Sequence, residues 1–139
     1  MDEIAQVERR LKISLPGDYV SFLREFGWIG LEGMELYGVG SGVPTHWELC
    51  LNVEGERTMF MPFMPTFLIP VMADGAGNHY CLDTSRLEDG RCPVVFWDHE
   101  DPRGNRQIPQ VVAASFVEWL WNHLNELESF AGDEEQSLQ

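Results

Sequence analysis

Six side chains in the middle of the chain are of types that bind metal ions or carry out acid–base and nucleophilic chemistry. They are Asp74, His79, Cys81, Asp83, Asp98 and His99. Alternate side chains of a strand point to the same face, so His79, Cys81 and Asp83 would lie together. A metal or hydrolase site built on them would normally carry a recognisable spacing. The sequence contains no HExxH, CxxC, acidic calcium-loop or GxSxG pattern.

Structural roles account for several of these residues more simply. Asp74 and Asn78 flank Gly75-Ala76-Gly77, where short polar side chains commonly hydrogen-bond to the backbone of a turn. Asp83 is expected to cap the turn that follows it. Histidines outside a ligand motif are more often hydrogen-bonded structural or surface groups than ligands. We therefore expect no metal, no cofactor and no catalytic residue, and do not expect an enzyme.

The cysteines and the amino terminus indicate the compartment. Cys50, Cys81 and Cys92 are odd in number and have no paired spacing, which fits neither a disulfide framework nor a zinc site. The first ten residues carry charges where a signal peptide needs an apolar core, and no apolar run approaches the roughly 18 to 20 residues of a membrane span. We expect reduced, mostly core cysteines, a cytoplasmic location and no contact with membrane.

The charge balance restricts the class of partner. Asp and Glu number 23 against 9 Lys and Arg, which gives a formal net charge of -14. This charge repels phosphate backbones, so we expect no nucleic-acid binding. A cationic protein is the natural complement, although solubility alone explains the charge equally well.

The candidates for a partner-binding surface are acidic side chains and one tryptophan. The acids form two groups in the sequence, and a partly exposed tryptophan in the glycine-rich region is a plausible interface anchor. The partner-binding candidates are Asp98, Glu100 and Asp101 in one group, Glu48, Glu54 and Glu56 in the other, and Trp28. The alternatives to a binding role are that the acids are ordinary solvated surface charges and that Trp28 is buried.

Two helices are expected near the amino terminus and one near the carboxyl terminus. Ile4, Val7 and Leu11 have helical spacing, and a second helix follows Pro16 and ends at Gly27. Ser115 and Glu118 form a capping box that opens the last helix. We expect the domain to cover residues 1–128 and an acidic, flexible tail to cover residues 129–139.

The middle of the chain predicts a sheet. Residues 67–72 and 79–83 are apolar runs joined by Asp74–Asn78, which indicates a hairpin, and Pro93–Trp97 gives a third strand of an antiparallel meander. Before them we expect one short strand at Met34–Tyr37, and after them an exposed loop at Asp98–Gln110. The sequence therefore predicts a single α+β domain, with an antiparallel sheet flanked by N-terminal helices and a C-terminal helix.

Residues 45–58 are ambiguous. Trp47, Leu49, Leu51 and Val53 alternate as in a strand, whereas Thr45 and Glu48 have the spacing of a capping box. We favour a helix here, on the cap and on the family resemblance below.

Five short sequence motifs between Ile4 and Leu127, in this order, resemble those of the SUKH superfamily. They are Leu15-Pro16 with Tyr19, Phe22 and Leu23; Ile69-Pro70 leading to Asp74-Gly75 and Gly77-Asn78; Cys81-Leu82-Asp83; Val95 to Glu100; and Ser115-Phe116 with Trp119-Leu120. The chain departs from the family pattern at Phe26-Gly27 and in the Met- and Pro-rich run Met59–Pro65.

The resemblance implies a sheet surrounded by helices, no catalytic residues, and action by binding. Many such domains are bacterial immunity proteins that neutralise a cognate toxin, and a nuclease with a basic cleft would complement the acidic surface. The alternative is a regulatory or scaffold domain that connects proteins without inhibiting them. The sequence leaves the toxin and the oligomeric state open.

Overall fold

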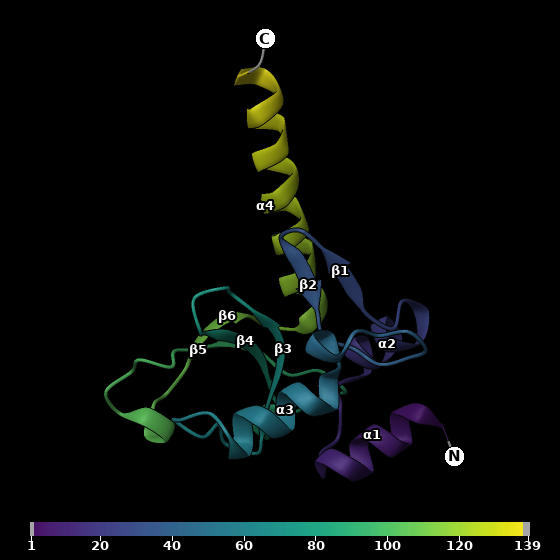
Figure 1. Ribbon diagram of the computed structural model, residues 1–139, viewed down its shortest axis with the longest axis vertical. Helices are drawn as coiled ribbons and strands as arrows, with labels where there is room; N and C mark the ends of the chain where they lie inside the picture. Colours follow the sequence, from purple (N-terminus) through teal and green to yellow (C-terminus); the bar gives the residue numbers. More distant parts are fainter. Residues whose placement is uncertain (1, 138–139) are drawn as a thin grey trace.

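The computed structural model describes the backbone of residues 2–137 and the side chains of residues 2–129, and it has an α+β fold (Figure 1). The helices are α1 (Glu3–Leu11), α2 (Gly17–Glu25), α3 (Leu49–Thr58) and α4 (Phe116–Ser137). The strands are β1 (Ile29–Leu31), β2 (Met34–Leu36), β3 (Leu68–Ala73), β4 (His79–Asp83), β5 (Val94–Trp97) and β6 (Gln110–Ala113). Short 3-10 turns lie at Thr45–Trp47, Thr84–Arg86 and Gly104–Arg106.

The sheet is an antiparallel meander in the order β3-β4-β5-β6. His79 pairs with Trp97 across β4 and β5, and Val95 pairs with Val111 across β5 and β6. The predicted three-strand meander is confirmed, but the sheet has a fourth strand. The predicted loop ends at Gln110, where β6 begins. This strand escaped prediction because its first three side chains are exposed, so it has no clear alternation of buried and exposed positions.

A separate antiparallel hairpin, β1–β2, precedes α3. The single strand expected at Met34–Tyr37 is β2, and its partner β1 was missed because Gly30 and Gly33 made the region read as loop. Beyond β2, the Tyr37 amide donates a hydrogen bond to the Val71 carbonyl, 2.8 Å away. The hairpin is therefore joined to the free edge of β3.

The two faces of the sheet pack against different parts of the chain. Ile69, Leu82 and Val94 belong to the main core, which also contains buried side chains of all four helices. The opposite face carries a smaller cluster of Leu68, Cys81, Val95 and Trp97, covered by Met64. His79 and Cys81 share one face, as the sequence predicted, and the structure shows that this face lies away from the main core.

The amino-terminal helices form where the sequence predicted them. Asp2 caps α1 by accepting a hydrogen bond from the Ile4 amide, and Ile4, Val7 and Leu11 are buried. In α2, Tyr19 is fully buried, and its hydroxyl donates to the Tyr37 carbonyl at 2.9 Å.

The ambiguous segment forms a helix, but its cap differs from the predicted one. The predicted capping box at Thr45 and Glu48 is not formed, because Thr45–Trp47 is a 3-10 turn. Glu48 is itself the N-cap of α3, and its Oε2 accepts a hydrogen bond from the Leu51 amide at 2.7 Å. Glu48 was expected at the third position of the helix, but it is the residue that caps the start of α3.

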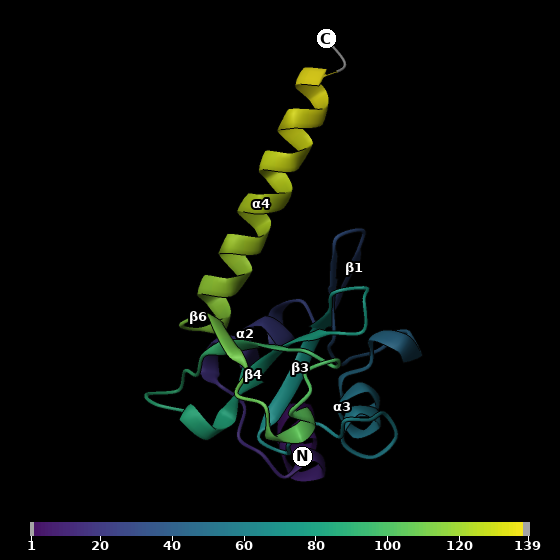
Figure 2. The same ribbon diagram turned by 90° about the vertical axis from the view of Figure 1, so that its left-hand side faces the viewer.

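Helix α4 starts as predicted and extends past the predicted domain boundary. Ser115 Oγ accepts from the Glu118 amide, and Glu118 Oε2 accepts from the Ala114 amide. The backbone is helical to Ser137, beyond residue 128, and α4 projects away from the body in two views (Figures 1 and 2). The flexibility of 129–139 stays a prediction, and residues 138–139 lie outside the described part. Among the described residues, helices that are both long and apolar enough to cross a bilayer are absent.

Candidate protein-binding site

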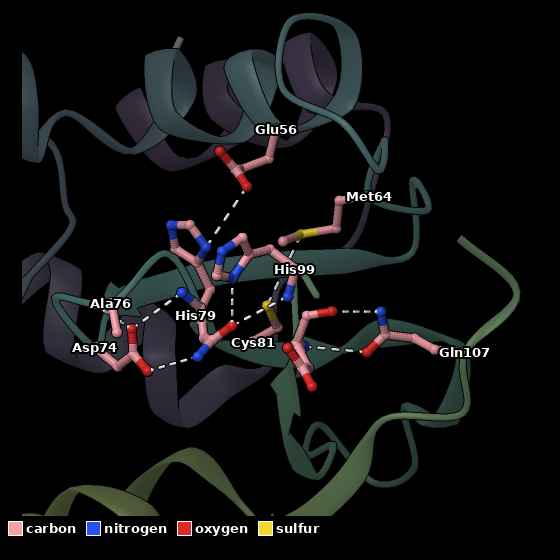
Figure 3. A network of polar contacts seen from close by, with 10 residues as sticks. Glu56, Met64, Asp74, Ala76, His79, Cys81, His99 and Gln107 are labelled. Carbon is pink, nitrogen blue, oxygen red and sulfur yellow. Dashed lines mark hydrogen bonds and ion pairs between the residues drawn. The ribbon is translucent and has the colours of Figure 1, made fainter. Parts of the chain in front are cut away.

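A pocket of about 440 Å³ opens on the face of the sheet opposite the main core. One wall is the segment that follows α3, and the other is formed where β4 begins and β5 ends. Its lining includes Glu56, Met59, Met61, His79, Trp97 and His99. Figure 3 shows Glu56 pointing from α3 towards the imidazole rings of His79 and His99.

His79 is buried at the first position of β4. Its Nδ1 lies 3.5 Å from Glu56 Oε1 and has no hydrogen-bond partner among the described residues. Burial lowers the pKa of His79 to about 4, an effect that nearby His99 reinforces and Asp74 opposes. The ring is therefore neutral at neutral pH, and a neutral imidazole has one nitrogen that accepts a hydrogen bond.

Glu56 is a half-buried carboxylate on α3. Burial raises its pKa, because removal from water disfavours the charged form, while His99 acts in the opposite direction. Within the described part of the chain, the Arg–carboxylate ion pairs join Arg10 to Glu54, Arg24 to Asp2, Arg86 to Asp83 and Arg103 to Asp101. Glu56 faces a histidine instead of a cation.

His99 is held in place by the hairpin between β3 and β4. Asn78 Oδ1 accepts from the His99 amide at 3.0 Å and lies 2.7 Å from His99 Nδ1. Asn78 Nδ2 in turn donates to Asp74 Oδ2, which fixes the orientation of the amide. Nδ1 therefore carries a proton, because an amide oxygen can only accept, and Nε2 faces Glu100 Oε1 at 3.4 Å. Gly77 has a φ of +95°, and a Cβ there would lie 2.6 Å from the His99 ring.

The predicted turn role of Asp74 is confirmed, since its Oδ1 accepts from the amides of Ala76 and Asn78. Asn78 follows the prediction only in part, because its Oδ1 bridges to His99 instead of capping the turn. Asp83 caps the next turn as predicted and accepts from the Ser85 amide.

The outer wall of the pocket belongs to a run of exposed apolar side chains, which we call the Met-Phe segment (residues 59–63); residues 59–62 of this segment line the pocket. Met59 is 71% exposed, Phe60 56%, Met61 78% and Phe63 41%. The segment follows the end of α3, where the Met59 and Phe60 amides both donate to the Gly55 carbonyl. An apolar run of this exposure marks an interaction surface more often than a stable free surface.

The acidic loop (residues 98–101) borders the same pocket. Glu100 has an 81% exposed side chain, with Oε1 3.4 Å from His99 Nε2. Asp98 accepts from the Glu100 amide, while Asp101 is largely buried and bonded to Arg103. Of the three acids predicted here, Glu100 thus presents an open charge, and the other two shape the loop.

The remaining predicted partner-binding residues lie elsewhere. Glu48 is occupied as the cap of α3, and Glu54 pairs with Arg10 of α1. Trp28 is half-buried and stacks on Trp47, with ring centroids 5.6 Å apart. The structure therefore brings Glu56 and the acidic loop together around one pocket and separates them from Glu48, Glu54 and Trp28.

The residues considered for metal or nucleophile chemistry do not form one site. Cys81 is fully buried with its sulfur 3.8 Å from Met64 Sδ, and burial raises the pKa of this thiol. Asp83 is bonded to Ser85 and Arg86. Among the described residues, a cluster of three or more His, Cys, Asp or Glu side chains with metal-binding geometry is not found.

Sequence reasoning did not assign a binding role to the Met-Phe segment or to His79. The signal for the former was present, because Met59–Pro65 is unusually rich in Met, Phe and Pro and departs from the family pattern. No sequence signal placed His79 beside Glu56, since they come from a strand and a helix 23 residues apart (79 − 56).

Two comparisons relate the chain to known proteins. A family model described as SUKH_5: SMI1-KNR4 cell-wall matches residues 1–125. The chain is also similar to the SPbeta prophage-derived uncharacterized protein YokK of Bacillus subtilis (strain 168), with 23% identity over 149 aligned positions. That alignment covers 90% of this chain and 74% of the relative.

Proposed function

The chain belongs to the SMI1-KNR4 (SUKH) family, and from this premise we propose that it is an immunity protein that binds and neutralises a cognate toxin domain. The partner is a protein, and the place of action is the cytoplasm. No catalytic residue is assigned to this chain.

The observation that carries the proposal is the exposed Met-Phe segment beside the pocket. Methionine and aromatic side chains are enriched in protein interfaces, and flexible methionines adapt to irregular partner surfaces. Four such side chains within five residues, each at least 41% exposed, supply apolar area that a partner would remove from water.

Charge supports the same class of partner. The chain carries a formal net charge of -14, and Glu100 projects from the acidic loop next to the pocket. A basic toxin domain, such as a nuclease with a phosphate-binding cleft, would be attracted to this surface and oriented by it.

The test is co-expression with any toxin domain that a neighbouring gene encodes. We expect the toxin alone to arrest growth, and co-expression of this protein to restore growth and yield a stable complex on purification. A toxin that remains active and does not co-purify would overturn the proposal.

A scaffold role is the second candidate, and it has one observation in its favour. Helix α4 projects from the body (Figure 2) and exposes Trp121 (62%) and Leu124, neither of which lines the pocket. A domain that connects two proteins needs two surfaces. In the same experiment, complex formation without relief of toxicity would favour the scaffold over the immunity protein.

A further inference from the structure

We infer that the pocket beside the Met-Phe segment receives an arginine side chain of the protein partner, with the guanidinium on Glu56 and His79 and the stem against the apolar wall. This inference rests on the proposed function only in that the partner is a protein. It adds the anchor residue and the place where that residue is bound.

Among the described residues, two polar groups of the pocket lack a cationic or hydrogen-bonding partner. Glu56 offers a carboxylate, and His79 Nδ1, which is buried 3.5 Å from it, has no hydrogen-bond partner in the described part of the chain. Arginine carries five N–H donors in a planar fork and no acceptor. One guanidinium can therefore satisfy the carboxylate and an imidazole nitrogen together, which the compact ammonium group of lysine does less well.

The electrostatics of the empty pocket favour a cation. Glu56 is half-buried and has no arginine partner among the described residues, whereas four other carboxylates there do. A desolvated carboxylate without a cation, beside an unsatisfied imidazole, is unfavourable in the free protein. A cation from the partner removes both penalties, so the binding energy is concentrated here.

The apolar wall suits the rest of an arginine side chain. Met59, Phe60 and Met61 line the pocket together with the rings of Trp97 and His99. The three methylenes of arginine pack on such a surface, and its guanidinium plane stacks favourably on aromatic rings. The exposure of Met59 and Met61 extends the apolar surface outside the pocket, which indicates a macromolecular partner and not a free small amine.

The test uses two short peptides, acetyl-Ala-Arg-Ala-amide and its citrulline counterpart, which has nearly the same shape without the charge. Their binding is followed by NMR on the full chain labelled at the methionine methyl groups. We expect the arginine peptide to shift the methyl signals of Met59 and Met61 in a saturable way. Met34 is the internal control, because it is buried in the main core and should not move.

The citrulline peptide should bind roughly ten-fold more weakly, since a charge-assisted hydrogen bond is about twice as strong as a neutral one. Equal affinity for the two peptides, or saturable shifts at Met34 without shifts at Met59 and Met61, would overturn the inference. An arginine peptide that causes no saturable shift would overturn it as well.

The matched variants are Glu56→Gln and Glu54→Gln. Each removes one charge from α3, but Glu56 lines the pocket whereas Glu54 pairs with Arg10 outside it. Glu56→Gln should weaken the arginine peptide roughly ten-fold, and Glu54→Gln should bind it as the wild type does. Removal of a desolvated charge is not expected to unfold the protein, and the unshifted Met34 signal verifies this. Equal binding by both variants would contradict the assignment to Glu56.

The toxin separates this inference from the proposed function. If Glu56→Gln binds and neutralises the toxin as the wild type does, the immunity function stands and the arginine site is wrong. If the arginine peptide binds as described but the toxin is neither bound nor inhibited, the site stands and the immunity function is wrong.

Discussion

Acidification should destabilise this protein mainly through His79. The folded state lowers the pKa of this ring from its ordinary value of 6.5 to about 4 by burial. Between these two values the unfolded chain binds a proton that the folded chain does not. The contribution of His79 to stability is therefore present above about pH 6.5 and is lost as the pH falls towards 4.

The size of the effect follows from the two pKa values. At about pH 5 the unfolded histidine is mostly protonated and the folded one mostly neutral, so the free energy of unfolding should be about 2 kcal/mol lower than at about pH 7. Glu56 works in the opposite direction, because its raised pKa makes the folded state more stable as the pH falls. The pKa of Asp74 is lowered, but this group acts mainly below the window.

The assay is urea unfolding followed by tryptophan fluorescence at about pH 7, 6 and 5. The wild type is compared with His79→Gln and with His46→Gln, which removes an exposed histidine. We expect the loss on acidification in the wild type and in His46→Gln, and a much smaller loss in His79→Gln. The comparison uses the change with pH within each variant, so a difference in overall stability does not affect it. If His79→Gln loses as much stability as the wild type, the buried neutral histidine is not the cause.

Three further predictions concern the fold and the acidic loop. Tyr19→Phe leaves the buried Tyr37 carbonyl without its donor at 2.9 Å, and should lower the free energy of unfolding by about 1 to 2 kcal/mol in the same urea assay. Gly38→Ala should prevent folding or greatly reduce soluble yield, because a Cβ there would overlap the Gly27 carbonyl; Gly17→Ala, whose Cβ meets its nearest atom at 3.6 Å, should fold normally. Glu100→Lys should slow association with the toxin and weaken its salt dependence, whereas Glu32→Lys, the same charge change on the β1–β2 hairpin, should have a smaller effect in stopped-flow binding. Equal rates for the two lysine variants would mean that net charge, and not the acidic loop, governs encounter.

Local patterns in the sequence determined much of the fold. The spacing of Ile4, Val7 and Leu11 and the turn chemistry of Asp74 act over a few residues, so they can be read without knowledge of the rest of the chain. The five motifs that resemble the SUKH superfamily are also short and local in the sequence. The meander and the last helix were predicted for the same reason.

Elements that are defined by their pairing or packing, and not by a clear pattern of their own, were missed or ambiguous in the sequence. Strand β6 has three exposed side chains in its four residues and is defined by its pairing with β5. Strand β1 contains a glycine and is defined by its antiparallel pairing with β2. Residues 45–58 carried both strand and helix patterns, and the burial of Leu49 and Val53 against the main core is compatible with the helix. Propensity gives only a weak preference in such segments, and tertiary packing overrides it.

The sequence by itself determined that this chain is acidic, that it folds as one α+β domain and that it resembles a family that acts by binding. It could not determine which acids are available, because Asp98, Asp101, Glu48 and Glu54 differ from Glu100 only in the bonds that the folded chain makes. Only the tertiary structure placed Glu56 of α3 within 3.5 Å of His79 of β4 and left the Met-Phe segment exposed beside them. The physical reason is that desolvation and the lack of a partner are properties of a residue's surroundings, and these surroundings come from segments far apart in the chain.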